Sequence, residues 1–206
     1  MRPARSRQTW RRGLVATEFA LVAPLFFLVA LAGSDLIRVF RAQLRAEAIA
    51  VQIGQIVSQC RAITNPGDRN NFWAHARRIA GSVIDVDGTA ANQGTMIISA
   101  VARNTAGTAN VLSWQMRTGN TGNVSRLGAS VGGAATVSDS FIVPATHTLL
   151  VTEVYARVQP WTLSAGLIGT ALPATIYGTT LFLSRAPDPA TLQTAPASLS
   201  TPDCTA

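Results

Sequence analysis

One acidic residue, Glu18, stands near the start of an apolar run that extends from Leu14 to Gly33. A carboxylate in an apolar helix is costly in hydrocarbon, so it usually has a cationic partner or a function. If the peptide bond after Gly13 is cut, the amine of Leu14 becomes the N-terminus and lies one helical turn from Glu18. The helix macrodipole also favours a carboxylate there. Glu18 is therefore predicted to pair with an amine, on its own chain or on a neighbouring subunit.

The remaining polar residues lack the spacing of a catalytic or metal site. His75 and His147 are far apart in the sequence, and neither has an acid and a nucleophile at an informative distance. The stretch 85–88, Asp-Val-Asp-Gly, begins like a calcium loop but lacks the third ligand and the closing glutamate, which favours a turn. The glycine-rich stretch 128–135 lacks the ending of a phosphate-binding loop. We therefore expect no enzyme, no metal site and no cofactor.

Cys60 and Cys204 are the two cysteines of the chain, and they do not have metal-ligand spacing. If the domain is exported to an oxidising compartment, an even pair favours one long-range disulfide. That bond would tie the end of the first helix to the C-terminal tail. Two unpaired thiols remain the alternative.

Positive charge is concentrated in residues 1–13, which contain 5 arginines and no acid. The formal net charge is +7, but the rest of the chain has 12 arginines against 10 acids. A basic segment directly before an apolar run stays in the cytoplasm. Residues 1–13 are therefore interpreted as a cytoplasmic leader and 14–36 as a single membrane span, with the C-terminal domain outside. A nucleic-acid partner is not expected, because no basic face with interleaved aromatic residues follows.

One long helix over 14–60 is expected to carry these residues, and its second half has amphipathic spacing. Pro24 is expected to kink it and Gly54 to soften it. A turn cluster ends this helix. A short helix is then predicted over 70–84, with Asn70 or Asn71 as its N-cap.

After the short helix the pattern changes to runs of β-branched and apolar residues, which predict an antiparallel sheet of about four strands. The runs cover residues 95–103, 110–117, 146–160 and 173–185. The fold class is therefore α+β, with a long transmembrane and amphipathic helix followed by a small domain over 61–185.

Two segments of the chain lack a regular pattern. Residues 118–147 are rich in Gly, Thr, Ser, Asn and Ala and are interpreted as a long surface loop. Residues 186–206 are interpreted as an extended tail that is fixed, if at all, through Cys204. Trp73, Trp114 and Trp161 are expected in the core or on a face of the sheet.

The segment from Gly13 to Phe19 resembles the prepilin-peptidase site of type IV pilins, in which a glycine precedes four residues, Glu and Phe. The longer run ATEFALVAPLFFLV is similar to the TadE/TadF-like minor pilins, or pseudopilins, of the tight-adherence (Tad/Flp, type IVb) pilus system. The resemblance is strong over residues 11–45. The stretch TLLVTEVYARVQP, with Glu153 and Tyr155 before a proline, resembles the C-terminal strand of such proteins.

This resemblance implies that a prepilin peptidase recognises Gly13, that Leu14 becomes the mature N-terminus, and that Glu18 and Phe19 serve assembly. It implies other pilins as partners of the N-terminal helix, and also the Tad assembly platform in the bacterial inner membrane. The implied role is surface adhesion and biofilm formation, with the domain in the periplasm. About 140 residues follow the helix, unlike many Tad major pilins, which favours a minor pilin.

Alternatives remain open for both processing and function. Ala30-Leu31-Ala32 before Gly33 fits an ordinary signal-peptidase site, and an uncleaved anchor is the third outcome. The chain is alternatively a membrane-tethered periplasmic adhesin or binding domain that never enters a filament, with residues 118–147 as its contact surface. A periplasmic enzyme is the least favoured function.

Overall fold

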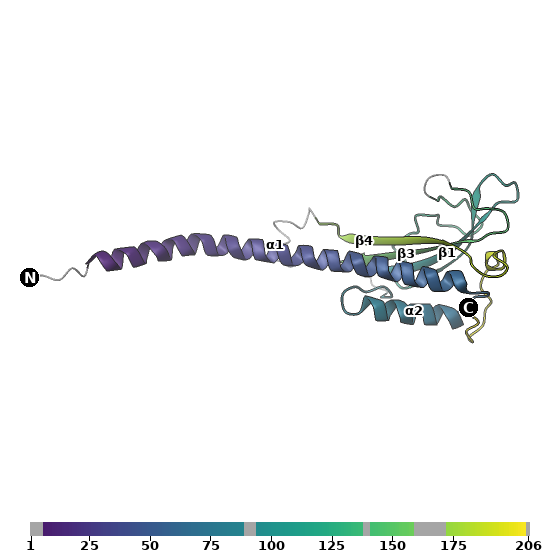
Figure 1. Ribbon diagram of the computed structural model, residues 1–206, viewed down its shortest axis with the longest axis horizontal. Helices are drawn as coiled ribbons and strands as arrows, with labels where there is room; N and C mark the ends of the chain where they lie inside the picture. Colours follow the sequence, from purple (N-terminus) through teal and green to yellow (C-terminus); the bar gives the residue numbers. More distant parts are fainter. Residues whose placement is uncertain (1–5, 89–93, 138–140, 159–171, 205–206) are drawn as a thin grey trace, which may run out of the picture. The chain divides into compact units, whose positions relative to one another are not determined.

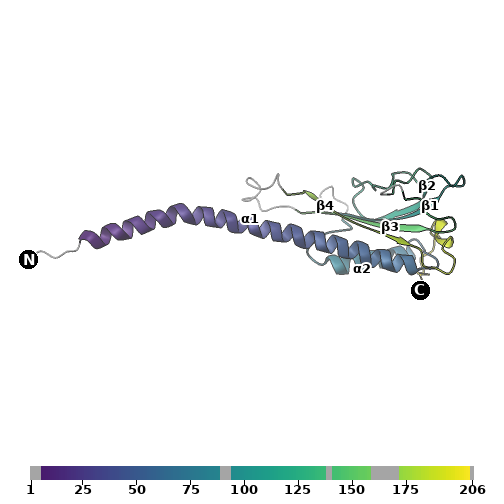
Figure 2. The same cartoon turned by 45° about the horizontal axis from the view of Figure 1, so that its top comes forward.

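The computed structural model describes residues 6–88, 94–137, 141–158 and 172–204, with side chains from Ala16 onward. The chain divides into two compact units, Met1–Val39 with Gln159–Pro173, and Phe40–Val158 with Ala174–Ala206. The elements are α1 (Ser6–Gln59), α2 (Gly67–Ala80), β1 (Thr95–Arg103), β2 (Asn110–Arg117), β3 (Leu149–Arg157), β4 (Thr175–Leu183) and the 3₁₀ turn η2 (Thr191–Gln193). Figure 1 labels the helices and three of the strands, and Figure 2 also labels β2. The predicted α+β class is confirmed.

Helix α1 begins at Ser6, before the predicted start at Leu14, and ends at Gln59. It continues through Pro24. In the first unit its large apolar side chains between Phe19 and Val29 are between 61% and 79% exposed, except for Leu28, which is half-buried. Within Ala16–Gln59 the helix is long and apolar enough to cross a membrane. An apolar helix with so many exposed side chains fits a membrane anchor.

From Phe40 onward, α1 belongs to the second unit and buries one side of its surface. The fully buried positions recur at intervals of mostly three or four residues: Ala42, Ala46, Ile49, Ala50, Ile53 and Val57. A Cβ placed on Gly54 would lie 2.8 Å from Thr180 Oγ1, and one on Gly178 would lie 2.9 Å from the carbonyl carbon of Ala46. Gly54 therefore does more than soften the helix, because it allows α1 to pack closely on β4.

The four strands form one antiparallel sheet in the order β2-β1-β3-β4. The predicted bounds of β1 and β2 agree with the structure, whereas β3 and β4 are shorter than predicted. The register of the last pair places Glu153 opposite Thr179 and Tyr155 opposite Tyr177. Side chains alternate between the two faces of a strand, so Glu153, Tyr155, Tyr177 and Thr179 share one face.

The two faces of the sheet are covered by different kinds of structure. Figures 1 and 2 show α2 and the end of α1 on one side. The opposite face is covered by the described part of residues 118–147, which was expected to be a surface loop. An apolar cluster joins it to the strands, and its members are Val101, Leu112, Leu127, Ala135, Val137, Val143, Leu149 and Val151. We call the described part of residues 118–147 the lid. It covers this face of the sheet because burying the apolar side chains there removes them from water.

Helix α2 begins at Gly67 and ends at Ala80, so the predicted range of 70–84 is displaced. The prediction of Asn70 or Asn71 as N-cap is wrong, since the cap position is Pro66 and no side chain caps the helix. Asp68 lies in the first turn and is buried. The turn cluster that was expected to precede the helix therefore supplies its first residues.

The C-terminal tail is packed against the domain, which corrects the expectation of an extended segment fixed only at Cys204. Backbone hydrogen bonds run from Asn65 N to Ala197 O at 2.8 Å and from Gly67 N to Leu199 O at 3.0 Å. The indole Nε1 of Trp114 donates to Leu192 O at 2.7 Å. Trp114 is buried as expected and Trp73 is half-buried, whereas Trp161 lies outside the described residues.

Candidate functional site

The N-terminal part of α1 contains the residues expected to act in processing and assembly. Gly13 and Leu14 lie within the helix, and Glu18 follows Leu14 by one turn. Glu18 and Phe19 are both exposed, Phe19 at 72%. The first turn of α1, which begins at Ser6, contains no acidic residue. A helix that began at Leu14 would have Glu18 at the end of its first turn, where a carboxylate is favoured.

A second constellation holds the C-terminal tail against the start of α2. Cys60 and Cys204, 144 residues apart in sequence, are joined by a disulfide. Beside it the buried Asp68 carboxylate accepts backbone N–H bonds from Asp203 at 3.0 Å, from Cys204 at 3.0 Å and from Thr64 at 2.8 Å. Burial acts to raise the pKa of Asp68, but these bonds outweigh it and lower the pKa. Asp68 therefore remains an anion that fixes the tail.

The third constellation surrounds Glu153, which lies at the centre of β3 and is fully buried. Its carboxylate accepts a hydrogen bond from the Ser125 hydroxyl. It also accepts the backbone N–H of Arg126 at 2.9 Å. The Tyr177 hydroxyl donates to it at 2.9 Å. The Tyr155 hydroxyl shares its proton between Glu153 at 3.3 Å and Val124 O at 2.9 Å. These four donors come from two strands and from the lid, so one buried carboxylate joins three segments.

The two tyrosines of this cluster are difficult to ionise. Burial raises the pKa of Tyr177 to about 12, and the charge of Glu153 adds to the rise, although Thr179 and Arg126 oppose it. The pKa of Tyr155 is raised further, first by burial and then by the charge of Glu153. Both hydroxyls therefore stay protonated at neutral pH and act as donors.

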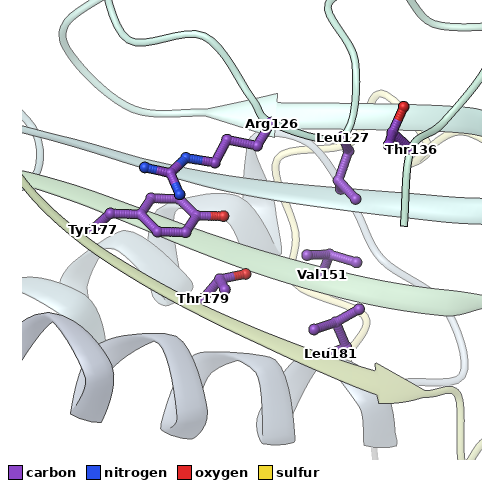
Figure 3. Close-up of a pocket in the computed structure, with 7 residues that line it drawn as sticks. All are labelled: Arg126, Leu127, Thr136, Val151, Tyr177, Thr179 and Leu181. Carbon is purple, nitrogen blue, oxygen red and sulfur yellow. The ribbon is translucent and has the colours of Figure 1, made fainter. Parts of the chain in front are cut away.

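A hollow of about 300 Å³ lies beside this cluster, between the lid and β4 (Figure 3). The guanidinium carbon of Arg126 is 3.7 Å from the centroid of the Tyr177 ring, which is the geometry of a cation–π contact. The residues that line the hollow are Arg126, Leu127 and Thr136 from the lid and Val151, Tyr177, Thr179 and Leu181 from the strands.

Sequence reasoning did not find this cluster as a site. It noted Glu153 and Tyr155 only as part of a strand that resembles a family. The available signal was a glutamate inside a β-branched run with a tyrosine two residues later on the same face. The partners Ser125, Arg126 and Tyr177 carried no signal, because they are distant in sequence.

The other candidate residues do not come together. His75 is exposed on α2, and His147 is half-buried before β3. Asp85 Oδ1 accepts the backbone N–H groups of Asp87 and Gly88 at 3.0 Å each, which is a turn as expected. Over the described ranges, no group of three or more His, Cys, Asp or Glu residues has the geometry to hold a metal ion.

A family model described as TadE-like protein matches residues 13–54. The resemblance is thereby confirmed for this segment, which contains Leu14, Glu18 and most of α1. The TadE-like family is associated with pili and is not an enzyme family, so the match suggests involvement in the Tad pilus system, with partners from that system. No curated protein and no solved structure matches the chain significantly.

Proposed function

We propose that this protein is a membrane-anchored minor pilin, or pseudopilin, that takes part in the assembly or function of a tight-adherence pilus. One coincidence supports this most strongly. The TadE-like match over 13–54 covers the part of α1 that exposes both Glu18 and a continuous apolar surface. A carboxylate on a helix in hydrocarbon needs a cationic partner, and a packed bundle of cleaved pilin helices would offer one amine per subunit.

In this proposal the peptide bond after Gly13 is cut by a prepilin peptidase on the cytoplasmic side of the inner membrane. Leu14 then carries the free amine, and the Glu18 carboxylate of one subunit accepts a hydrogen bond from the N-terminal ammonium group of the next. The basic residues 1–13 hold the N-terminus in the cytoplasm, which places the sheet domain in the periplasm. From there the domain would cap, prime or decorate a pilus that serves adhesion and biofilm formation.

N-terminal sequencing of the mature protein, purified from membranes of its host, tests the processing step. We expect Leu14 as the first residue. Gly13→Val should leave the leader attached, because a larger side chain would not fit a site that accepts glycine. Gly33→Val is the matched control, since a Cβ on Gly33 meets nothing within 4 Å. It should leave cleavage unchanged.

A second variant separates processing from assembly. Glu18→Ala should be cleaved normally but be lost from sheared and purified pili, whereas Val22→Ala on the same exposed surface should enter them. A mature chain that begins at Gly33 would indicate ordinary secretion, and one that retains Met1 would indicate a plain anchor; either contradicts the proposal. A wild-type chain that is cleaved after Gly13 but absent from pili would favour the tethered binding domain.

A further inference from the structure

We propose that the hollow beside β4 binds an extended peptide segment of another protein, which adds to the free edge of β4 and presents a carboxylate to Arg126. The inference rests on the second unit of the chain and does not depend on the pilus assignment. Three observations support it. Among the described residues, part of the β4 edge has no strand partner, and the Arg126 guanidinium has no carboxylate partner. The third observation is the apolar lining of the hollow beside them.

The two edge strands of the sheet differ in how their outer backbone groups are bonded. On the β2 edge, Leu112 N donates to Gly133 O at 3.0 Å and Gly132 N donates to Leu112 O at 2.7 Å, so the lid covers part of that edge. β4 occupies the other end of the sheet, and its strand partner is β3. Alternate residues of an edge strand direct their N–H and C=O groups away from the sheet, ready to pair.

Part of the β4 edge is already engaged, which locates the open part. Gln43 Nε2 of α1 donates to Tyr177 O at 3.2 Å. Beyond the strand, Arg185 N donates to Ser58 O, near the end of α1, at 2.7 Å. The stretch between them is exposed at Thr179, Leu181 and Leu183, with Leu181 at 41%. This stretch borders the hollow, and a strand added here would place its side chains over it.

Arg126 supplies the charge that selects the partner. One face of its guanidinium rests on the Tyr177 ring, which leaves the N–H donors at the rim of the group free to bind in its plane. The ion pairs in the described part of the chain are Asp35 with Arg38 and Arg77 with Asp87, so Arg126 has no carboxylate partner there. The neighbouring Glu153 already receives four hydrogen bonds. A carboxylate is the group whose geometry matches the free guanidinium edge.

The rest of the hollow indicates the kind of segment that fits. Leu127, Val151 and Leu181 form apolar walls, and Thr136 and Thr179 contribute hydroxyls. A volume of about 300 Å³ is at the lower end for ligand pockets, which suits the side chains of a short extended segment. Residues two apart on an added strand point the same way, so one can meet Arg126 while the other meets Leu181.

A second copy of this chain does not meet this requirement through its own β4. That strand reads TIYGTTLFL and contains no acidic residue. Pairing of β4 with β4 of another copy would leave Arg126 without an anion. This argues against a dimer built by β4–β4 pairing and favours an acidic extended segment of a different protein.

The test uses the full-length protein in nanodiscs and a fluorescent peptide, acetyl-Thr-Val-Glu-Val-Thr-Val-amide. Two control peptides replace Glu by Gln or carry N-methyl groups on alternate backbone nitrogens. We expect the Glu peptide to bind and the Gln peptide to bind about tenfold more weakly, the change that loss of one charge-assisted hydrogen bond produces. The N-methylated peptide should also bind more weakly, because it lacks backbone N–H donors for the edge of β4. Arg126→Gln should weaken binding of the Glu peptide by the same factor, so that the variant binds the Glu and Gln peptides equally. Arg78→Gln, at an exposed arginine of α2, should change neither.

Several results would overturn the inference. These are absence of binding at millimolar peptide, equal binding of the Glu and Gln peptides by the wild type, and unchanged discrimination in Arg126→Gln. Full binding of the N-methylated peptide would exclude strand addition. Anionic lipid vesicles that bind in place of the peptide and depend on Arg126 would assign the arginine to a membrane surface instead. The alkaline titration of the tyrosines, described below, shows whether the Arg126 variant retains the native cluster.

Discussion

Two carboxylates of this protein, Asp68 and Glu153, are buried and satisfied by hydrogen-bond donors instead of by cations. Asp68 collects backbone N–H groups from the tail, and Glu153 collects three hydroxyls and one backbone N–H. Buried anions of this kind are stable only while every donor remains in place, because an unpaired buried charge costs several kcal/mol. Each therefore acts as a fixed point between segments that are remote in sequence.

The Glu153 cluster can be observed directly, because Tyr155 and Tyr177 are the only tyrosines in the chain. We expect tyrosinate absorbance to show no ionisation near the ordinary pKa of 10.0, because the pKa of Tyr177 is raised to about 12 and that of Tyr155 is also strongly raised. In Glu153→Gln both pKa values should fall, because the negative charge is removed while burial remains. A midpoint near 10.0 in protein that keeps its native circular dichroism would contradict the buried cluster.

The same shifts set the alkaline limit of stability. The folded-state pKa of each tyrosine lies above the unfolded value of 10.0, so the unfolded state loses its protons first as the pH rises. The contribution of the cluster to stability is therefore complete below pH 10 and is lost progressively toward pH 12. This gives the titration experiment a second readout, the midpoint of urea unfolding across that range.

Asp68→Asn should destabilise the domain by about 2–3 kcal/mol, because an amide nitrogen would face backbone N–H donors. The free energy of unfolding of the wild type should fall as the pH drops below 3.8, the pKa of Asp68 in the unfolded chain, toward its lower pKa in the folded protein. Asp68→Asn should lack this part of the fall. Urea unfolding of the full chain in detergent at several pH values measures both effects. Asp203→Asn, at an exposed side chain, is the control and should behave as wild type. Equal stability of the two variants would refute the role of Asp68.

At the scale of the elements, the first and second parts of α1 have different surfaces. Its first part exposes large apolar side chains, whereas its second part buries a face on which alanines at 42, 46 and 50 lie among Ile49, Ile53 and Val57. Small side chains allow the helix backbone to approach β4 closely, at Gly178 and Gly54. One helix therefore serves as the anchor candidate and as part of the domain core.

The two glycines at this contact should respond differently to alanine. In Gly178→Ala the new Cβ meets backbone atoms of Ala46 and Glu47 at 2.9–3.0 Å, so we expect a loss of about 1–3 kcal/mol. In Gly54→Ala the new Cβ meets side-chain atoms of Thr180 and Phe182 instead of backbone, and the gain in helix propensity of about 1 kcal/mol offsets part of the cost. Urea unfolding should therefore show a larger loss for Gly178→Ala than for Gly54→Ala. The reverse order would contradict the packing.

At the scale of the whole molecule, the disulfide reports on the compartment of the domain. In cells, Cys60 and Cys204 should be resistant to maleimide under denaturing conditions until a reductant is added, after which two thiols should react, as the structure joins them. Cys204→Ser should release one reactive thiol without reduction. Two thiols that react before reduction would place the domain in a reducing compartment, against the proposed periplasmic location.

The same bond closes 144 residues of sequence, so reduction should lower the free energy of unfolding by about 3–5 kcal/mol in the chain-entropy account. The tail should nevertheless stay docked in the reduced native state, because Asp68 and the backbone bonds at Asn65 and Gly67 also hold it. Hydrogen exchange of residues 197–204 before and after reduction measures this. Complete loss of protection on reduction would show that the disulfide alone fixes the tail.

The sequence by itself determined α1, the positions of all four strands and the TadE-like segment. These features are local, because helical and strand periodicity repeats within one run of residues and the motif from Gly13 to Phe19 is contiguous. The bounds of β1 and β2 needed no information beyond the run itself and the turn between them.

Only the tertiary structure decided where the irregular segments lie. The segment 118–147 has no period, so nothing in it showed that Leu127 and Val137 cover the sheet. The start of α2 depends on Asp68, whose carboxylate faces a tail more than a hundred residues away. Arg126, Glu153 and Tyr177 meet for the same reason, through the pairing of β3 with β4 and the position of the lid. Contacts between segments distant in sequence are chosen by burial and by the pairing of polar groups, and a one-dimensional pattern does not record them.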